Sequence, residues 1–141
     1  LTDQGWSVRE TECARVGPFG VSSIRGLVRH EASNSFITVY LHRIRKKGEP
    51  DIAGFFYSSS TDLKNWSEPK LLYRQPLRRD AGDGEPFVAY PSIIDEDSTD
   101  RLFGTVDDKA SLVFVRLVPK PYKGRWRVPR QLIRVPISIK E

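Results

Sequence analysis

The sequence lacks methionine altogether and has a single cysteine, Cys13, among its 141 residues. A lone cysteine cannot form an intrachain disulfide, and it has no partners at the spacing of zinc ligands, so neither kind of crosslink explains the stability of the fold. Since the chain begins at Leu1 and contains no methionine, we expect it to be a processed or truncated piece of a longer product.

Long apolar runs and helical patterns are also scarce. The run 112–115 is interrupted at once by Arg116, so we expect no bilayer span, no signal-peptide core and no membrane partner. Ten glycines and ten prolines are scattered so that few windows could hold a helix of normal length. The length, with 38% hydrophobic and 29% charged residues, indicates one small globular domain, and an all-β fold is the default.

The charges fall into three blocks. Residues 1–79 carry 13 basic and 8 acidic side chains, residues 80–108 carry 1 and 9, and residues 109–141 carry 9 and 1. The last two blocks therefore have opposite net charges, which favours attraction between them. The densest basic cluster, 43–47, leads into Gly48 and Pro50 as the solvated tip of a hairpin would, so a nucleic-acid partner is disfavoured.

Runs rich in Val, Ile, Phe and Tyr, bounded by turn residues, predict seven strands. In 36–41 both alternating faces are largely apolar, so this strand should be covered on both sides. The predicted strands are 24–30, 36–44, 52–60, 70–74, 87–94, 110–118 and 131–135.

Three tryptophans, Trp6, Trp66 and Trp126, stand 60 residues apart, and the segments 66–74 and 126–134 that follow two of them are related. Thr-Asp pairs precede Trp6 and Trp66, which predicts a turn whose Asp accepts backbone N–H bonds beneath a covering indole ring. Packing within the fold is favoured for these rings over stacking on sugars. Four strands repeated about every 60 residues predict a β-propeller.

The segment 55–69, with its Ser-Thr-Asp-Leu and Asn-Trp residues, resembles a recurrent motif of the five-bladed propellers of the arabinanase, levansucrase and invertase superfamily, including glycoside hydrolase family 43. The Pro-Ser strand 89–95 and the closing segment 132–137 are similar to others in that group. The predicted fold is a partial propeller of about 2.3 four-stranded blades: 1–23 ends an upstream blade, 24–80 is complete, and 81–141 is the final blade with a hairpin insertion at 95–108.

The resemblance implies a carbohydrate partner in a central funnel, cleaved between two carboxylic acids while a third tunes their protonation. In that family the three groups usually come from earlier blades, so this chain alone is not expected to be a complete active site. Closure of the propeller would need a missing N-terminal portion or another copy of the chain. An extracellular or periplasmic location is what the family suggests.

One local segment, 78–91, concentrates arginines, carboxylates, glycines and aromatics just before a strand. Glu85 is interpreted as a general acid and Asp83 as a base or pKa modulator. Side chains two apart on an extended chain lie about 7 Å apart, a spacing that an inverting glycosidase tolerates but that leaves the retaining and inverting outcomes both open. The alternative is a glycine-rich surface turn whose acids pair with nearby arginines. The predicted substrate-binding residues are Arg78, Arg79, Asp80 and Tyr90, with Tyr90 and Phe87 favoured as core or lining residues over platforms.

The remaining candidates for chemistry are weaker. His30 and His42 have no serine or carboxylate spaced to suggest a triad, so both are interpreted as structural or surface groups. The segment 95–100 offers oxygen ligands suited to calcium but lacks the glycine and flanking helices of an EF-hand, so a structural calcium ion and a solvated hairpin are both open; no other cofactor is expected.

Two functions follow from these patterns. The leading hypothesis is the C-terminal portion of a glycoside hydrolase-like propeller that binds or hydrolyses a glycan, and so a glycosidase if complete. The alternative is a propeller scaffold that binds carbohydrate or protein without catalysis.

Overall fold

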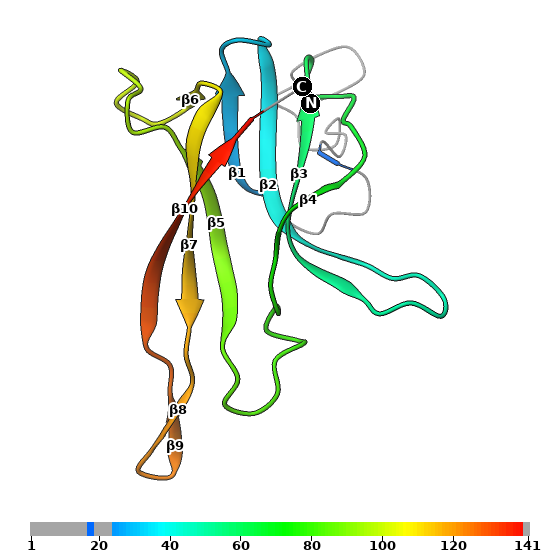
Figure 1. Cartoon of the computed structure of the whole chain (residues 1–141). Helices are drawn as coiled ribbons and strands as arrows, with labels where there is room; N and C mark the ends of the chain where they lie inside the picture. Colours follow the sequence, from blue (N-terminus) through cyan, green and yellow to red (C-terminus); the bar gives the residue numbers. More distant parts are fainter. Residues whose placement is uncertain (1–16, 19–23, 140–141) are drawn as a thin grey trace, which may run out of the picture.

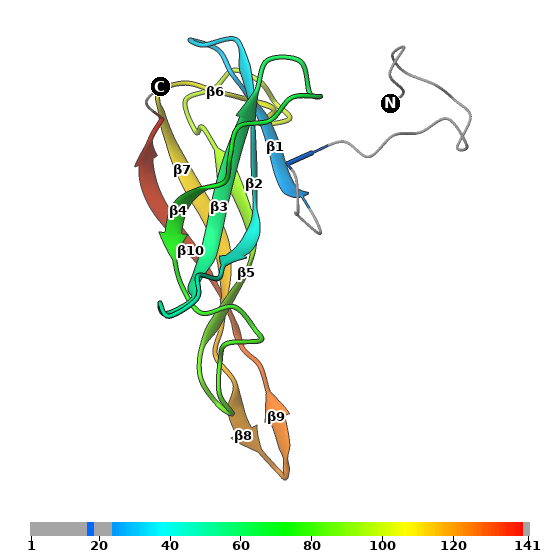
Figure 2. The ribbon, with the colours of Figure 1, turned by 90° about the vertical axis from the view of Figure 1, so that its right-hand side faces the viewer.

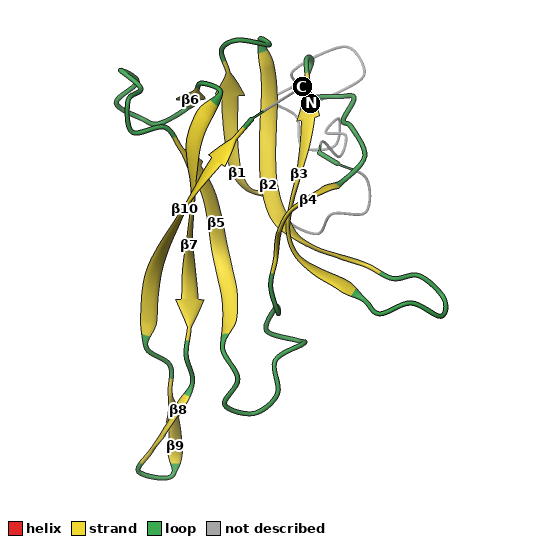
Figure 3. Ribbon diagram, in the orientation of Figure 1, coloured by secondary structure: helices red, strands yellow, loops and turns green. Residues whose placement is uncertain are grey.

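The computed structural model describes residues 17–18 and 24–139, which form strands and loops with no helix (Figure 3). The fold is therefore all-β, as the sequence predicts. A helix with the length and hydropathy needed to span a membrane is not found in this part of the chain. The strands are β1 (Ile24–His30), β2 (Ser35–Ile44), β3 (Ile52–Ser60), β4 (Lys70–Arg74), β5 (Phe87–Ile94), β6 (Thr105–Val106), β7 (Lys109–Leu117), β8 (Lys120–Tyr122), β9 (Arg125–Arg127) and β10 (Arg130–Ser138) (Figure 1).

The strands form two larger sheets and one separate ribbon. The first sheet has the order β4-β3-β2-β1-β6, in which β1 to β4 are an antiparallel meander and β6 runs parallel to β1. The second sheet has the antiparallel order β10-β7-β5. Strands β8 and β9 pair only with each other within the described residues.

The two sheets share one apolar core. Val39 and Phe55 from the first sheet pack with Leu112 and Phe114 from the second, and all four side chains are buried. The rings of Phe55 and Phe114 meet edge to face with centroids 5.1 Å apart, a favoured aromatic geometry. Burying this much apolar surface is the main force that holds the sheets together.

The opposite face of the first sheet is also covered at its centre. Tyr40 and Phe56 lie directly opposite each other on β2 and β3, and neither side chain is exposed. Tyr40 and Ser58 hydrogen-bond through their hydroxyls at 2.6 Å. Strand β2 is thus buried on both faces, which confirms the prediction made from its two apolar faces.

The outward face of the second sheet carries apolar residues that are less covered, beside two exposed arginines, Arg130 and Arg134, which pair with Leu117 and Val113. Val113, Val115 and Leu117 of β7 are half-buried on this face, and Leu132 of β10, paired with Val115, is 76% exposed. Apolar residues on both faces of a sheet are typical of a sheet in the interior of a stack.

The turn after β3 has the geometry that its sequence predicts. The Asp62 carboxylate accepts hydrogen bonds from the backbone N–H groups of Lys64 and Asn65, each at 2.8 Å. The indole N–H of Trp66 donates to the carbonyl of Leu63, so this ring covers its own turn. The predictions for Trp6 and for residues 1–16 and 19–23 lie outside the described residues, as does the Trp126 side chain.

The sheets differ from the two four-stranded units that the repeat predicts. The segment 95–108, interpreted as a hairpin insertion, contributes β6, which pairs with β1 in the other sheet. The second sheet has three strands, because β8 and β9 pair with each other as a separate ribbon and do not extend it. Pro119, Pro121 and Pro129 flank or occupy this ribbon, and proline supplies no N–H for a wider ladder.

Candidate functional site

The predicted site segment lies in the long loop 75–86 between β4 and β5, which reaches the same end of the molecule as the β8–β9 ribbon (Figure 1). A cavity of about 530 Å³ lies between this loop, the start of β5 and the base of the ribbon. Arg78, Asp83, Glu85 and Tyr90 all line it. Four of the six predicted site residues are therefore brought together at one cavity.

The two predicted catalytic carboxylates occupy a tight turn. Glu85 accepts a hydrogen bond at Oε2 from the backbone N–H of Gly82 at 2.9 Å, and its own N–H donates to the Gly82 carbonyl. Gly84 has φ +82°, a left-handed conformation that favours glycine, and so allows the turn between Asp83 and Glu85. Both acids are exposed. The arrangement presents two carboxylates to a ligand at the cavity wall.

Two aromatic residues line the cavity: Tyr90, which is exposed, and Phe87, which is half-buried. Tyr90 sits at a bulge in β5, where the register against β7 shifts between Ala89 and Ser92, and its φ is +56°. A bulge re-aims the side chain out of the ladder, and residue Tyr90 is 54% exposed. The guanidinium of Arg25 lies 5.9 Å from the ring centroid. Non-glycine residues with positive φ often mark binding sites, because the surrounding structure must hold the strain.

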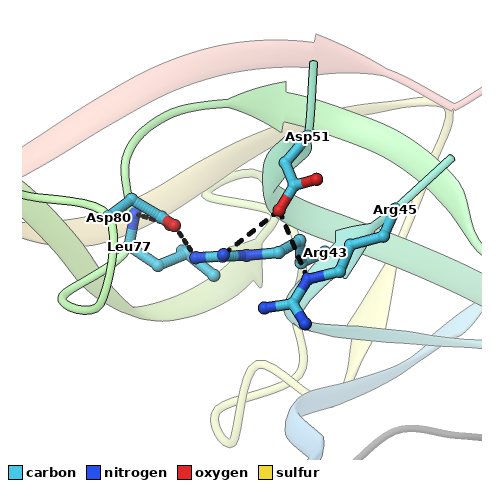
Figure 4. A network of polar contacts seen from close by, with 5 residues as sticks. All are labelled: Arg43, Arg45, Asp51, Leu77 and Asp80. Atoms are coloured by element: carbon cyan, nitrogen blue, oxygen red, sulfur yellow. Dashed lines mark hydrogen bonds and ion pairs between the residues drawn. The ribbon is translucent and has the colours of Figure 1, made fainter. Parts of the chain in front are cut away.

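Asp80 lies away from this cavity. Its carboxylate pairs with Arg43 of β2 and accepts a hydrogen bond from the Leu77 backbone N–H (Figure 4). The same Arg43 guanidinium reaches Asp51 at 3.2 Å. Asp80 therefore anchors the loop to the β2–β3 hairpin, while Arg79 is exposed on the turn and does not line the cavity.

The basic cluster 43–47 is largely neutralised at its own hairpin. Arg43 and Arg45 both contact the Asp51 carboxylate, at 3.2 and 3.3 Å, and Lys46 lies 3.8 Å from Glu49. These contacts support its interpretation as a solvated hairpin tip.

His30 has partners that the sequence did not indicate. Its buried imidazole lies between the Ser33 hydroxyl, 2.8 Å from Nδ1, and the Asp108 carboxylate, 3.1 Å from Nε2. Ser33 also hydrogen-bonds the hydroxyl of Ser35. Ser33 is three residues along the chain and could have been found from its spacing in the turn, whereas no sequence signal points to Asp108. The imidazole joins the β1–β2 turn to the start of β7.

His42 is a packing residue. Its ring meets those of Tyr40 and Phe56 edge to face, with centroids 6.1 and 5.2 Å away. Burial lowers the pKa of His42, because an uncharged imidazole suits this apolar contact better than a charged one.

The acidic segment 95–108 uses its carboxylates to hold its own backbone. Asp95 accepts from the N–H groups of Asp97 and Asp107, and Asp100 accepts from Leu102 and Gly104. Within residues 17–18 and 24–139, no group of three or more His, Cys, Asp or Glu is arranged to hold a metal ion.

Comparisons with protein-family models, with curated proteins and with solved structures found no match for this chain.

Proposed function

We propose that this chain is part of a carbohydrate-binding β-propeller and that a glycan binds in the cavity beside loop 75–86. The observation that carries the proposal is the convergence of Arg78, Asp83, Glu85 and Tyr90 on that cavity. Carboxylates and guanidinium groups can hydrogen-bond sugar hydroxyls, and an exposed aromatic ring offers an apolar face to a sugar ring.

Two features of the fold support a propeller. The strands β1 to β4 form a meander, and its sheet packs on the second sheet through a shared apolar core, as neighbouring blades do. The outward face of the second sheet carries Leu132, which is 76% exposed and would be covered by a further sheet. We propose that further sequence of a longer protein, or another copy of the chain, supplies that sheet.

Binding without cleavage is the activity that these residues support best. A glycosidase general acid is kept protonated by apolar surroundings, as in enzymes whose acid lies in a hydrophobic pocket. Glu85 is instead exposed, in a turn where it accepts a backbone hydrogen bond. Glu85 and Asp83 therefore serve as hydrogen-bond acceptors for sugar hydroxyls in this proposal.

A binding and turnover screen tests the proposal. The chain is assayed by isothermal titration calorimetry against plant and microbial polysaccharides, and for turnover with a panel of aryl-glycosides. We expect saturable binding of at least one glycan, no release of the aryl group, and a loss of affinity of about tenfold in Tyr90→Ala, which corresponds to about 1.4 kcal/mol.

Phe103→Ala is the matched control, because Phe103 is also an exposed aromatic residue with positive φ, 53°, but does not line the cavity. It should bind as the wild type does. Failure of every glycan to bind, or full affinity in Tyr90→Ala, would rule out this site. Turnover that is lost in Glu85→Gln would instead favour the glycosidase.

A further inference from the structure

The β8–β9 ribbon and its flanks, residues 116–130, form a basic arm. This segment holds six cations and no acidic residue, and all six cations are exposed. The cations are Arg116, Lys120, Lys123, Arg125, Arg127 and Arg130.

The basic arm projects from the end of the two sheets, and two views at right angles show it extending away from them (Figures 1 and 2). Its cations also differ from those of the 43–47 cluster. Arg43, Arg45 and Lys46 each contact a carboxylate, whereas none of the six arm cations forms an ion pair within the described residues.

The register of the ribbon places like charges together. Lys120 is directly opposite Arg127, and Tyr122 is directly opposite Arg125. Because alternate residues of a strand share a face, these four side chains lie on one face of the ribbon. Two cations in a cross-strand pair are destabilising, and an isolated two-stranded ribbon is marginally stable to begin with. Folding alone therefore does not account for this face, whereas a bound anion would relieve the repulsion.

An aromatic ring accompanies these cations. The Tyr122 ring is 53% exposed, and the Lys123 ammonium lies 5.4 Å from its centroid. The face thus combines positive charge with an apolar surface. The cations would bind the anionic groups of a polymer, and the tyrosine ring would contact the apolar face of its sugar rings.

The basic arm continues directly into the proposed glycan site. Pro119, Val128 and Arg130, at the base of the arm, line the same cavity as Asp83 and Glu85. In the sequence, Lys120 follows Pro119 and Arg127 precedes Val128. A ligand that extends from the cavity along the arm would therefore meet these two cations first.

We infer that the ligand is an anionic polysaccharide, with its acidic groups on the basic arm and a sugar ring beside Tyr90. This inference rests on the proposed glycan-binding function and names its substrate class. The carboxylates Asp83 and Glu85 favour a polysaccharide over DNA, because they accept hydrogen bonds from the hydroxyls that a polysaccharide carries on each sugar, whereas the sugars within a DNA strand carry no free hydroxyl.

The test compares each acidic polymer with a neutral polymer that has the same sugar backbone. Polygalacturonate is compared with its neutral methyl ester, and dextran sulfate with dextran, so that carboxylate and sulfate are distinguished as the anionic group. We expect the acidic form of at least one pair to bind about tenfold more tightly than its neutral form at about 50 mM salt, and this preference to decline steeply by about 200 mM.

The triple variant Lys120→Gln, Arg125→Gln and Arg127→Gln should lose about tenfold in affinity for that acidic polymer and lower the salt slope by about one unit for each cation removed. Its melting temperature should stay the same or rise, because the Lys120–Arg127 repulsion is gone. The matched control removes the same charge from the other hairpin, with Arg45→Gln, Lys46→Gln and Lys47→Gln. That variant should keep the affinity and slope of the wild type.

The outcomes separate this inference from the function on which it rests. Equal affinity for the acidic and neutral polymers, with binding still weakened by Tyr90→Ala, would overturn the basic arm as a ligand site and leave glycan binding in place. Equal losses in the arm variant and the control variant would overturn it too. Tighter binding of single-stranded or duplex DNA than of either acidic polymer would replace the polysaccharide with a nucleic acid, and no binding of any glycan would remove both proposals.

Discussion

The hydroxyls of Tyr40 and Ser58 lie 2.6 Å apart on neighbouring strands, and both side chains are completely buried. Burial raises the pKa of Tyr40, although the hydrogen bond to Ser58 acts in the opposite direction. The pair supplies each buried hydroxyl with a hydrogen-bond partner beside the buried ring of Phe56.

Removing one member of this pair should be costly. We expect Tyr40→Phe to lower the free energy of unfolding by about 1–3 kcal/mol, because the buried Ser58 hydroxyl loses its partner. Urea unfolding measures the loss. Tyr57→Phe, which changes a half-buried tyrosine on the next strand, is the control and should cost less. The double variant Tyr40→Phe, Ser58→Ala should lose less free energy of unfolding than the two single variants lose together. A loss equal to that sum would mean that the two hydroxyls are not coupled.

Gly54 allows β3 and β4 to approach each other closely. A Cβ added there would lie 2.1 Å from the Tyr73 carbonyl oxygen and 3.1 Å from the Arg74 Cα, both of which are backbone atoms. We expect Gly54→Ala to destabilise the fold by about 3 kcal/mol, because the paired strands must separate. Hydrogen exchange should also show weaker protection of the β4 amides.

Gly48→Ala is the control for this substitution. Both glycines have positive φ, 158° at Gly54 and 84° at Gly48, but a Cβ at Gly48 would meet nothing within 4 Å. Gly48→Ala should cost about 1–2 kcal/mol through backbone strain alone. If the two variants lose the same free energy of unfolding, the added methyl group at Gly54 is accommodated without separation of β3 and β4, which contradicts the prediction.

Much of the sheet structure could be predicted from the sequence, because strand length and composition are local signals. The bounds 24–30, 52–60, 70–74 and 87–94 agree with β1, β3, β4 and β5. Strands β6, β8 and β9 were missed, since two or three residues carry no measurable periodicity. The parallel pairing of β6 with β1 depends on contacts between segments about 75 residues apart, which no local pattern reports.

The candidate site could be predicted from the sequence where its residues are close together in the chain. Asp83, Glu85 and Tyr90 lie within one short segment, so their shared location follows from the chain itself. The pairing of Asp80 with Arg43 and the contribution of the basic arm to the cavity do not follow, because they depend on where the β2–β3 and β8–β9 hairpins fold.

Asp62 should make stability depend on acid pH. Hydrogen bonds from the backbone of Asn65 and Lys64 hold the pKa of its carboxyl well below the ordinary value. A carboxyl whose pKa is lower in the folded state stabilises the fold fully above its unfolded pKa, and this contribution is lost as the pH falls toward the folded pKa. We therefore expect Asp62→Asn to unfold at lower urea concentration than the wild type at neutral pH, and the two midpoints to converge below about pH 4. Glu31→Gln, which removes an exposed acid from another turn, is the control for the loss of one negative charge. A constant difference between wild type and Asp62→Asn at every pH would mean that the charge is not involved.

His30 and Asp108 should contribute unequally to the link between the β1–β2 turn and the start of β7. The imidazole is buried, whereas the Asp108 side chain is 72% exposed. We expect His30→Ala to destabilise the fold by about 2–4 kcal/mol, because it opens a cavity and removes one of the two hydrogen-bond partners of Ser33. Asp108→Ala should cost less than about 1 kcal/mol, because water replaces an exposed contact. Hydrogen exchange locates the effect: the Glu31 amide, which donates to the Val106 carbonyl, should exchange faster in His30→Ala than in Asp108→Ala.

Asp107→Ala changes a neighbouring exposed acid and controls for the loss of charge. Equal losses in His30→Ala and Asp108→Ala would place the stabilisation in the contact between the two side chains and not in the packing of the buried ring.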